Sequence, residues 1–128
     1  MKIFITGATG FVGQAVMRYL LPLNHELFIL FRSEKTFTNE FRLLVKQTKA
    51  TLVQGDVLQP DSLSLIQECD VCLFLACNSK WGTLETPSTT HVAVNGTSNA
   101  LKLFGRAKRF VYVSSAAAMM FDEGFDSQ

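Results

Sequence analysis

The feature that most constrains this fold is a short apolar run near the N-terminus that ends in glycines. The run is Ile3 to Ile5, and Gly7, Gly10 and Gly13 follow it at three-residue spacing. Gly7 permits a sharp turn, Gly10 lets backbone touch a pyrophosphate, and Gly13 allows close packing of the next helix. That helix would direct unpaired N–H groups and its positive dipole end at a bound anion. The stretch predicts a strand, turn and helix that bind a dinucleotide, although tight turns also use glycine for steric reasons alone.

The stretch from Thr6 to Gly13 resembles the TGxxGxxG signature of the extended short-chain dehydrogenase/reductase family. This family comprises NAD(P)-dependent epimerases, dehydratases and reductases of sugars, flavonoids and steroids. The resemblance implies a Rossmann-type domain and hydride-transfer chemistry. It also implies that the residues around the turn contact the cofactor, namely Thr6, Gly7, Thr9, Gly10, Phe11, Val12 and Gly13.

Composition limits the classes of protein to consider. The chain has 128 residues, of which 48% are hydrophobic and 18% charged, so we expect one folded domain with a real core. A net charge of +1 with mixed signs argues against a nucleic-acid partner or an anionic membrane surface. The N-terminal apolar run is interrupted by Thr6-Gly7, and no run approaches ~18 apolar residues. We therefore expect no signal peptide, no membrane span and a cytoplasmic location.

Three cysteines lie around one apolar run, and two of them form a CxxC pattern. Cys69, Cys72 and Cys77 are odd in number, and no second pair or neighbouring histidine accompanies them. A disulfide framework and a metal site are both disfavoured by this pattern. We interpret the cysteines as small buried hydrophobic residues and predict no metal.

Hydrophobic periodicity predicts the remaining elements. After the glycine turn, one helix would bury a stripe of Val12, Ala15, Val16, Tyr19, Leu20 and Leu23. Further helices are expected at about 37–45, 60–66 and 88–106, and further strands at 27–31, 50–54, 70–77 and 110–115. This alternation predicts an α/β fold, a doubly wound parallel sheet of about five strands in the order 3-2-1-4-5.

Arg32 follows the second predicted strand, where a Rossmann domain contacts the adenosine ribose. A carboxylate at that point would bind the 2′-hydroxyl and repel a 2′-phosphate. Arg32 instead offers a charge-assisted contact to the phosphate, which favours NADP over NAD. A solvated loop arginine is the alternative, and the nearby Glu34 leaves NAD possible.

Two further stretches carry cofactor contacts by resemblance. Asp56-Val57 matches the family's acidic-hydrophobic pair, whose carboxylate accepts a hydrogen bond from the adenine amino group. Leu75-Ala76 matches the end of the family's fourth strand. The small residues Ala76 and Cys77 would let the nicotinamide-side ribose approach there, although a tightly packed core would favour the same side chains. Gly96 to Asn99 resembles the family's G-T-x-N, but Ala93 replaces the usual preceding asparagine. The polar contact normally made from position 93 is therefore in doubt.

Catalytic chemistry is incomplete in this sequence. The fifth strand resembles F-V-Y-x-S-S, so Ser115 takes the position of the substrate-orienting serine and Ser114 that of a cofactor contact. The family's proton-transferring Tyr-x-x-x-Lys pair is absent from this sequence. The only tyrosines are Tyr19 and Tyr112, and the residues four places after them are Leu23 and Ala116. Neither of the two histidines, His25 and His91, has the surroundings to replace it.

We therefore interpret residues 1–118 as a dinucleotide-binding Rossmann domain and 119–128 as a divergent tail, without the C-terminal substrate domain. The chain would be the cofactor portion of an extended reductase, epimerase or dehydratase, inactive by itself. One alternative is a non-catalytic dinucleotide-binding regulatory module that self-associates through the sheet edge at Phe110 to Val113. Another is that the sequence is a piece of a longer enzyme. The substrate is not identifiable, although the loop 78–87 has a length that suits a substrate-side flap.

Overall fold

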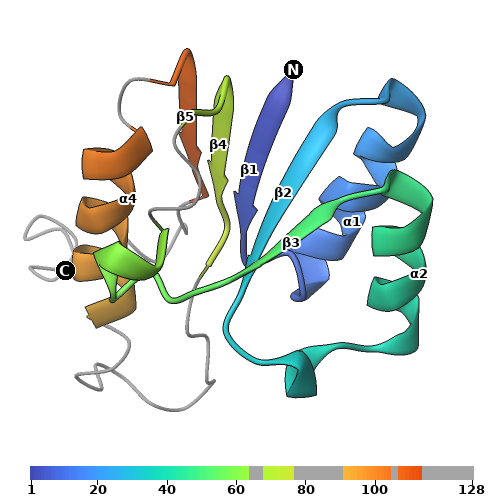
Figure 1. The fold of residues 1–128 in the computed structure, drawn as a ribbon, viewed down its shortest axis with the longest axis horizontal. Coiled ribbons are helices and arrows are strands. Elements are labelled where there is room, and N and C mark those ends of the chain that lie inside the picture. The colour runs from blue at the N-terminus through green and yellow to red at the C-terminus, as the bar shows by residue number, and fades with distance from the viewer. Residues whose placement is uncertain (64–67, 77–90, 105–106, 114–128) are drawn as a thin grey trace, which may run out of the picture.

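A computed structural model describes residues 1–63, 68–76, 91–104 and 107–113 of the chain. Its centre is a parallel sheet whose strand order is β3-β2-β1-β4-β5 (Figure 1), and this confirms the predicted topology. The strands are β1 (Lys2–Thr6), β2 (Glu26–Phe31), β3 (Thr51–Gln54), β4 (Val71–Phe74) and β5 (Arg109–Tyr112). β1 is central because it pairs with β2 on one side and with β4 on the other.

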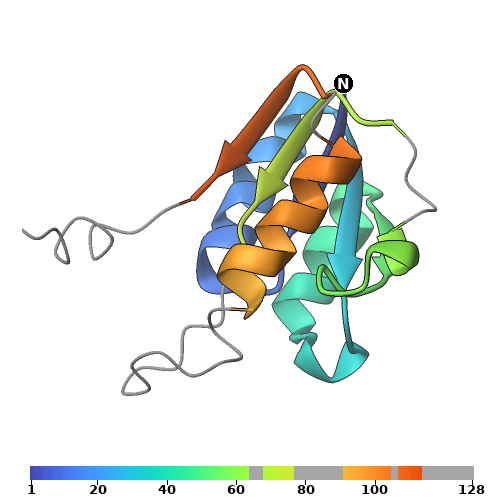
Figure 2. The same cartoon turned by 90° about the vertical axis from the view of Figure 1, so that its left-hand side faces the viewer.

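Helices cover the two faces of the sheet (Figures 1 and 2). On one face lie α1 (Phe11–Leu20) and α2 (Asn39–Thr48), joined by an ion pair between Arg18 and Glu40. On the other lie α4 (Thr97–Phe104) and the short helix η3 (Pro60–Leu63). The remaining short helices are η1 (Leu21–Leu23), η2 (Glu34–Thr36) and the π-helical η4 (His91–Gly96).

Alternation along β1 divides the core between the two faces, since successive strand residues point to opposite sides. Ile3 and Ile5 pack with Met17 of α1. Phe4 points the other way and packs against Phe104 of α4, with ring centroids 4.5 Å apart. β1 is therefore apolar on both faces, as its continuous hydrophobic run predicts.

The predicted buried stripe of α1 is wrong. The helix buries Gly13, Gln14 and Met17, whereas Val12, Ala15, Tyr19 and Leu23 of the predicted stripe are exposed, and Leu20 and Val16 are only partly buried. The physical reason is the glycine turn. Because Gly13 must lie against the turn, the rotation of the helix is set by that contact. Met17, four positions after Gly13, then faces the sheet. The side of the helix that carries Val12 and Tyr19 faces away from it.

The helix predicted over 88–106 is also modified. Residues His91–Gly96 form a π-helix, and the α-helix begins only at Thr97. α4 buries Ala100 and Phe104 and leaves Leu101 45% exposed. β3 begins at Thr51, one residue later than predicted, and Leu75 and Ala76 of the predicted fourth strand lie past β4. β5 begins at Arg109, one residue earlier than predicted, and the last two residues of that predicted strand lie outside the described ranges.

Cys72 is buried within β4, and burial raises the pKa of its thiol to about 12. Cys69 is partly buried, which raises its pKa as well. Both thiols therefore stay protonated near neutral pH, as expected for small hydrophobic residues. Cys77 lies outside the described residues. Within those residues, no group of three metal-ligating side chains is close enough to hold an ion.

β5 forms one edge of the sheet within the described ranges. Val111, Tyr112 and the following Val113 are 43%, 45% and 49% exposed. Self-association through this edge stays a prediction. In the same ranges, we find no helix with the length and hydrophobicity needed to cross a membrane.

Candidate functional site

Two of the three glycines are required by the protein's own packing. Gly7 has a φ of +77°, a backbone region that side chains disfavour, and an added Cβ would lie 2.6 Å from the Leu75 carbonyl carbon. At Gly13 an added Cβ would lie 2.3 Å from the Gly7 carbonyl oxygen. The turn therefore closes onto both β4 and α1, and only glycine fits at either position.

Gly10 differs, because no packing contact explains its missing side chain. An added Cβ there would meet nothing closer than the Gly7 oxygen at 3.4 Å, and the residue lines an open cavity. Gly10 is the N-cap of α1, with no side-chain hydrogen bond to the helix and no acidic residue in the first turn. The backbone N–H groups at this helix end face the space above Gly10, an arrangement that suits an anion.

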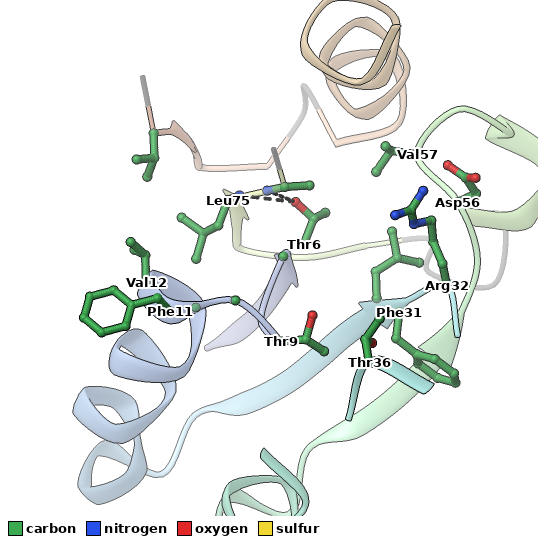
Figure 3. Close-up of a pocket in the computed structure, with 16 residues that line it drawn as sticks. Thr6, Thr9, Phe11, Val12, Phe31, Arg32, Thr36, Asp56, Val57 and Leu75 are labelled. Atoms are coloured by element: carbon green, nitrogen blue, oxygen red, sulfur yellow. Dashed lines mark hydrogen bonds between the residues drawn. The ribbon is translucent and has the colours of Figure 1, made fainter. Parts of the chain in front are cut away.

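Thr6 joins the ends of β1 and β4. Its side-chain Oγ1 accepts hydrogen bonds from the backbone N–H groups of Leu75 and Ala76, each at 3.2 Å (Figure 3). Its carbonyl also accepts from Leu75 at 3.1 Å. Thr6 is only 1% exposed, so these bonds are shielded from water. The two strand ends are thereby fixed side by side at the carboxyl edge of the sheet.

Gln14 fixes the other side of the turn. Its Nε2 donates to the Thr9 carbonyl at 2.9 Å, and its backbone N–H donates to the Gly10 carbonyl at 3.0 Å. The side chain is almost fully buried. The buried amide holds Thr9 and Gly10 in one conformation beneath the cavity.

The cavity at this edge has a volume of about 410 Å³ and brings together most of the predicted site (Figure 3). Twelve of the predicted cofactor contacts line it, namely Thr6, Gly7, Thr9, Gly10, Phe11, Val12, Gly13, Arg32, Asp56, Val57, Leu75 and Ala76. The carboxyl ends of β1, β2, β3 and β4 and the start of α1 thus contribute to one space. Phe11 lines its margin and is 93% exposed.

Arg32 and Asp56 occupy the same end of the cavity, and the guanidinium of Arg32 points toward the Asp56 carboxylate (Figure 3). No ion pair joins them, nor does Arg32 pair with any other acid in the described ranges. Asp56 Oδ1 accepts from the backbone N–H of Leu58 at 2.9 Å. Glu34 is exposed and does not line the cavity. A cationic group and a carboxylate oxygen are therefore both available to a ligand here.

Four lining residues were not predicted, namely Leu30, Phe31, Thr36 and Val113. Leu30 and Phe31 end β2, and Val113 follows β5. Their positions at strand ends were a signal in the sequence that could have placed them at the cavity. Thr36 had none, because its position depends on the short helix η2. Its hydroxyl donates to the Ser33 carbonyl at 2.8 Å, which leaves it as an acceptor only.

The other residues singled out in the sequence lie either outside the described part of the chain or away from this cavity. Ser114, Ser115 and the loop 78–87 lie outside the described residues, as does the expected boundary at residue 118. His25 lies at the opposite end of the sheet, with its Nδ1 3.3 Å from the Met1 amino group. His91 begins η4.

Comparison with known proteins decides the family. The model of the NAD dependent epimerase/dehydratase family matches residues 3–124. The chain belongs to this family. The match includes the glycine turn, the ends of β2 and β3, and the strand ends around Thr6, so it covers every described part of the cavity.

One curated protein and two solved structures are similar to the chain over most of its length. A putative dihydroflavonol 4-reductase of Synechocystis is 30% identical over 91% of this chain, which spans 33% of that protein. Yeast methylglyoxal/isovaleraldehyde reductase, solved with NADPH, has a TM-score of 0.72 at 22% identity, over 92% of this chain and 38% of its own. A mutant UDP-glucuronic acid 4-epimerase of Bacillus cereus, solved with NAD, has a TM-score of 0.74 at 22% identity, over 90% and 40%. The chain therefore spans between one third and two fifths of these proteins.

Proposed function

We propose that this chain binds a nicotinamide dinucleotide, with NADP preferred, as the cofactor portion of a reductase, epimerase or dehydratase. The observation that carries the proposal is the space at Gly10. Packing within the protein explains why Gly7 and Gly13 lack side chains, but it does not explain Gly10. A pyrophosphate bound above the start of α1 would explain it, because a side chain at Gly10 would occupy the same space. The family supports the same ligand, and the two solved relatives contain NADPH and NAD.

Different cavity residues would bind the different parts of the dinucleotide. Gly10 and the first N–H groups of α1 would hold the pyrophosphate. Asp56 would accept from the adenine amino group, and Val57 would contact the ring. Leu75 and Ala76, fixed by Thr6, would form the floor at the nicotinamide end. When bound, the cofactor supplies or accepts a hydride.

The preference for NADP rests on Arg32. Its guanidinium has no ion-pair partner in the described part of the chain and lies in the cavity. Glu34 lies outside that cavity, and Thr36 has no hydroxyl hydrogen to offer a phosphate. Arg32 is therefore the group that would bind a 2′-phosphate.

Proton transfer is not assigned to any residue here. Ser115 would orient a substrate hydroxyl or carbonyl, but it cannot relay a proton as a lowered-pKa phenol does. We propose that the 128-residue chain binds cofactor without turning over substrate, and that catalysis belongs to a longer protein.

Calorimetric titration of the chain with NADPH and with NADH tests the proposal. We expect both to bind, NADPH more tightly. Absence of binding for both cofactors would refute a dinucleotide site. Turnover of ketones, aldehydes or nucleotide sugars that disappears in Ser115→Ala would instead show a complete active site in this chain.

A further inference from the structure

We propose that Asn99 of α4 is a positioning residue for the adenine end of the cavity. It would hold the turn that carries Asp56 and Val57 at the distance from the sheet that an adenine ring requires. The inference rests on the proposed function, because it assigns to this tether part of the affinity for the adenosine half of the cofactor.

The first contact is a hydrogen bond between distant parts of the chain. Asn99 Nδ2 donates to the carbonyl oxygen of Val57 at 2.9 Å, across 42 residues of sequence. Asn99 is partly buried, so water competes with this bond only in part. The amide therefore attaches helix α4 directly to the backbone of a cavity residue.

The second contact comes from Gly96, the last residue of η4, which directly precedes α4 and lies three residues before Asn99. A Cβ at Gly96 would lie 2.8 Å from Val57 Cγ2 and 3.4 Å from Val57 Cβ. The absence of that side chain lets the start of α4 approach Val57 closely. The segment from Gly96 to Asn99 thus contacts both the carbonyl group and the side chain of Val57, which is 6% exposed and lines the cavity.

Other contacts give the turn its shape but do not connect it to α4. Ser62 Oγ accepts from the Asp56 N–H at 2.9 Å, and Asp56 Oδ1 accepts from the Leu58 N–H at the same distance. Gly55 N–H donates to the Phe31 carbonyl at 2.9 Å, which joins the turn to β2. The turn is therefore supported from β2 on one side and from α4 on the other. Without Asn99, the support from α4 is reduced to apolar packing, in which Val57 and Leu63 of η3 take part.

The test compares Asn99→Leu, which removes the donor at similar volume, with Ser98→Ala, an exposed neighbour on the same helix. Affinities for NADPH and for adenosine 2′,5′-bisphosphate, which is the adenosine half alone, are measured by calorimetry. Loss of one neutral hydrogen bond corresponds to about a three- to tenfold weakening. We expect that weakening for both ligands in Asn99→Leu and for neither in Ser98→Ala.

Hydrogen exchange of the cofactor-free chain provides a readout that a general loss of stability would not reproduce. In Asn99→Leu, the amides of Leu58 and Gln59 should exchange faster, while those of Leu75 and Ala76, at the other end of the cavity, should not. Gly96→Ala is a second variant with the same expected pattern, because its Cβ would displace Val57. It keeps the proposal testable where Asn99→Leu does not fold.

The outcomes separate this inference from the proposed function. If wild type binds NADPH and both variants retain full affinity for the bisphosphate, the positioning role is overturned and the cofactor site stands. Equal acceleration of exchange at both ends of the cavity would also overturn it, since the role would then be general stability. If wild type binds no dinucleotide, the proposed function and this inference fail together.

Discussion

A Cβ at Gly13 would lie 2.3 Å from the carbonyl oxygen of Gly7, a separation that real side chains do not reach. The same addition at Gly10 would meet that oxygen at 3.4 Å, which is close to ordinary contact. The three glycines of one motif therefore serve different purposes. Gly7 and Gly13 allow the turn to fold, and Gly10 leaves room above it.

This difference predicts opposite effects for two valine substitutions. Gly10→Val should leave the free energy of unfolding within about 1 kcal/mol of wild type but weaken NADPH binding at least about a hundredfold, or ~2.7 kcal/mol. Gly13→Val should destabilise the fold by about 3 kcal/mol, because it overpacks backbone that cannot move away. Urea unfolding and calorimetric titration of both variants measure these effects. A Gly10→Val chain that loses its fold would contradict the interpretation.

Arg32→Ala should selectively weaken NADPH binding. A hydrogen bond to a charged group contributes about 1.5–3 kcal/mol, so the dissociation constant should rise roughly 10- to 150-fold. NADH affinity should stay unchanged, because NADH has no 2′-phosphate. Lys35→Ala is the matched control, since it removes an exposed charge three residues away that does not line the cavity. Equal wild-type affinity for the two cofactors would contradict the assignment.

Gln14→Leu should weaken both stability and binding. The substitution leaves the Thr9 carbonyl without its donor, which costs about 1 kcal/mol of unfolding free energy. Affinities for NADPH and NADH should fall by the same factor, because both cofactors would place the same pyrophosphate above this turn in the proposed site. Gln47→Leu, at an exposed position of α2, is the control and should change neither affinity. A loss restricted to NADPH would show that Gln14 does not act through the turn.

Asp70 should make stability depend on acid pH. The backbone N–H of Lys2, at 2.8 Å, lowers the pKa of the Asp70 carboxyl, and the Lys108 charge lowers it further. The stabilisation is therefore fully present above the ordinary aspartate pKa of about 3.9 and is lost as the pH falls through the lowered value. Asp70→Asn should be less stable than wild type at pH 7, and the difference should shrink below about pH 4.

Urea unfolding between pH 7 and pH 2 measures that difference. Glu34→Gln is the control, because Glu34 is exposed and forms no ion pair in the described ranges. A wild-type advantage over Asp70→Asn that stays constant down to pH 2 would rule out this carboxylate as the cause.

The sequence allowed prediction of those features that depend on local chemistry. The turn at Gly7 to Gly13 needs glycine for reasons set by neighbouring backbone, and the continuous apolar strands predicted the order of the sheet. The buried face of α1 was predicted wrongly because it was chosen from the hydrophobic residues of the helix. Glycine adds little to a hydrophobic pattern, although Gly13 lies on the face that is buried. Gln14 was missed because a glutamine on a helix is ordinarily exposed.

Longer-range parts of the site had no readable signal. The Thr6 hydroxyl accepts hydrogen bonds from residues that lie 69 and 70 positions later in the chain. The Asn99 amide donates to a carbonyl 42 positions earlier. Such pairings depend on which strand ends and helix faces meet in space. Asp56 and Val57 were found through resemblance to the family, because their own sequence also reads as an ordinary turn.

The bonds from Thr6 to Leu75 and Ala76 also bear on the order of folding. The β1–β2 unit with its glycine turn closes over short chain distances, whereas β4 must return across about 70 residues to reach Thr6. Contacts of high sequence separation form late, because the entropy of loop closure opposes them until other interactions are in place. During folding, the half of the cavity at Gly10, where we propose the pyrophosphate, should therefore form before the half at Leu75 and Ala76, where we propose the nicotinamide. Full affinity for dinucleotide would be acquired only in the last step.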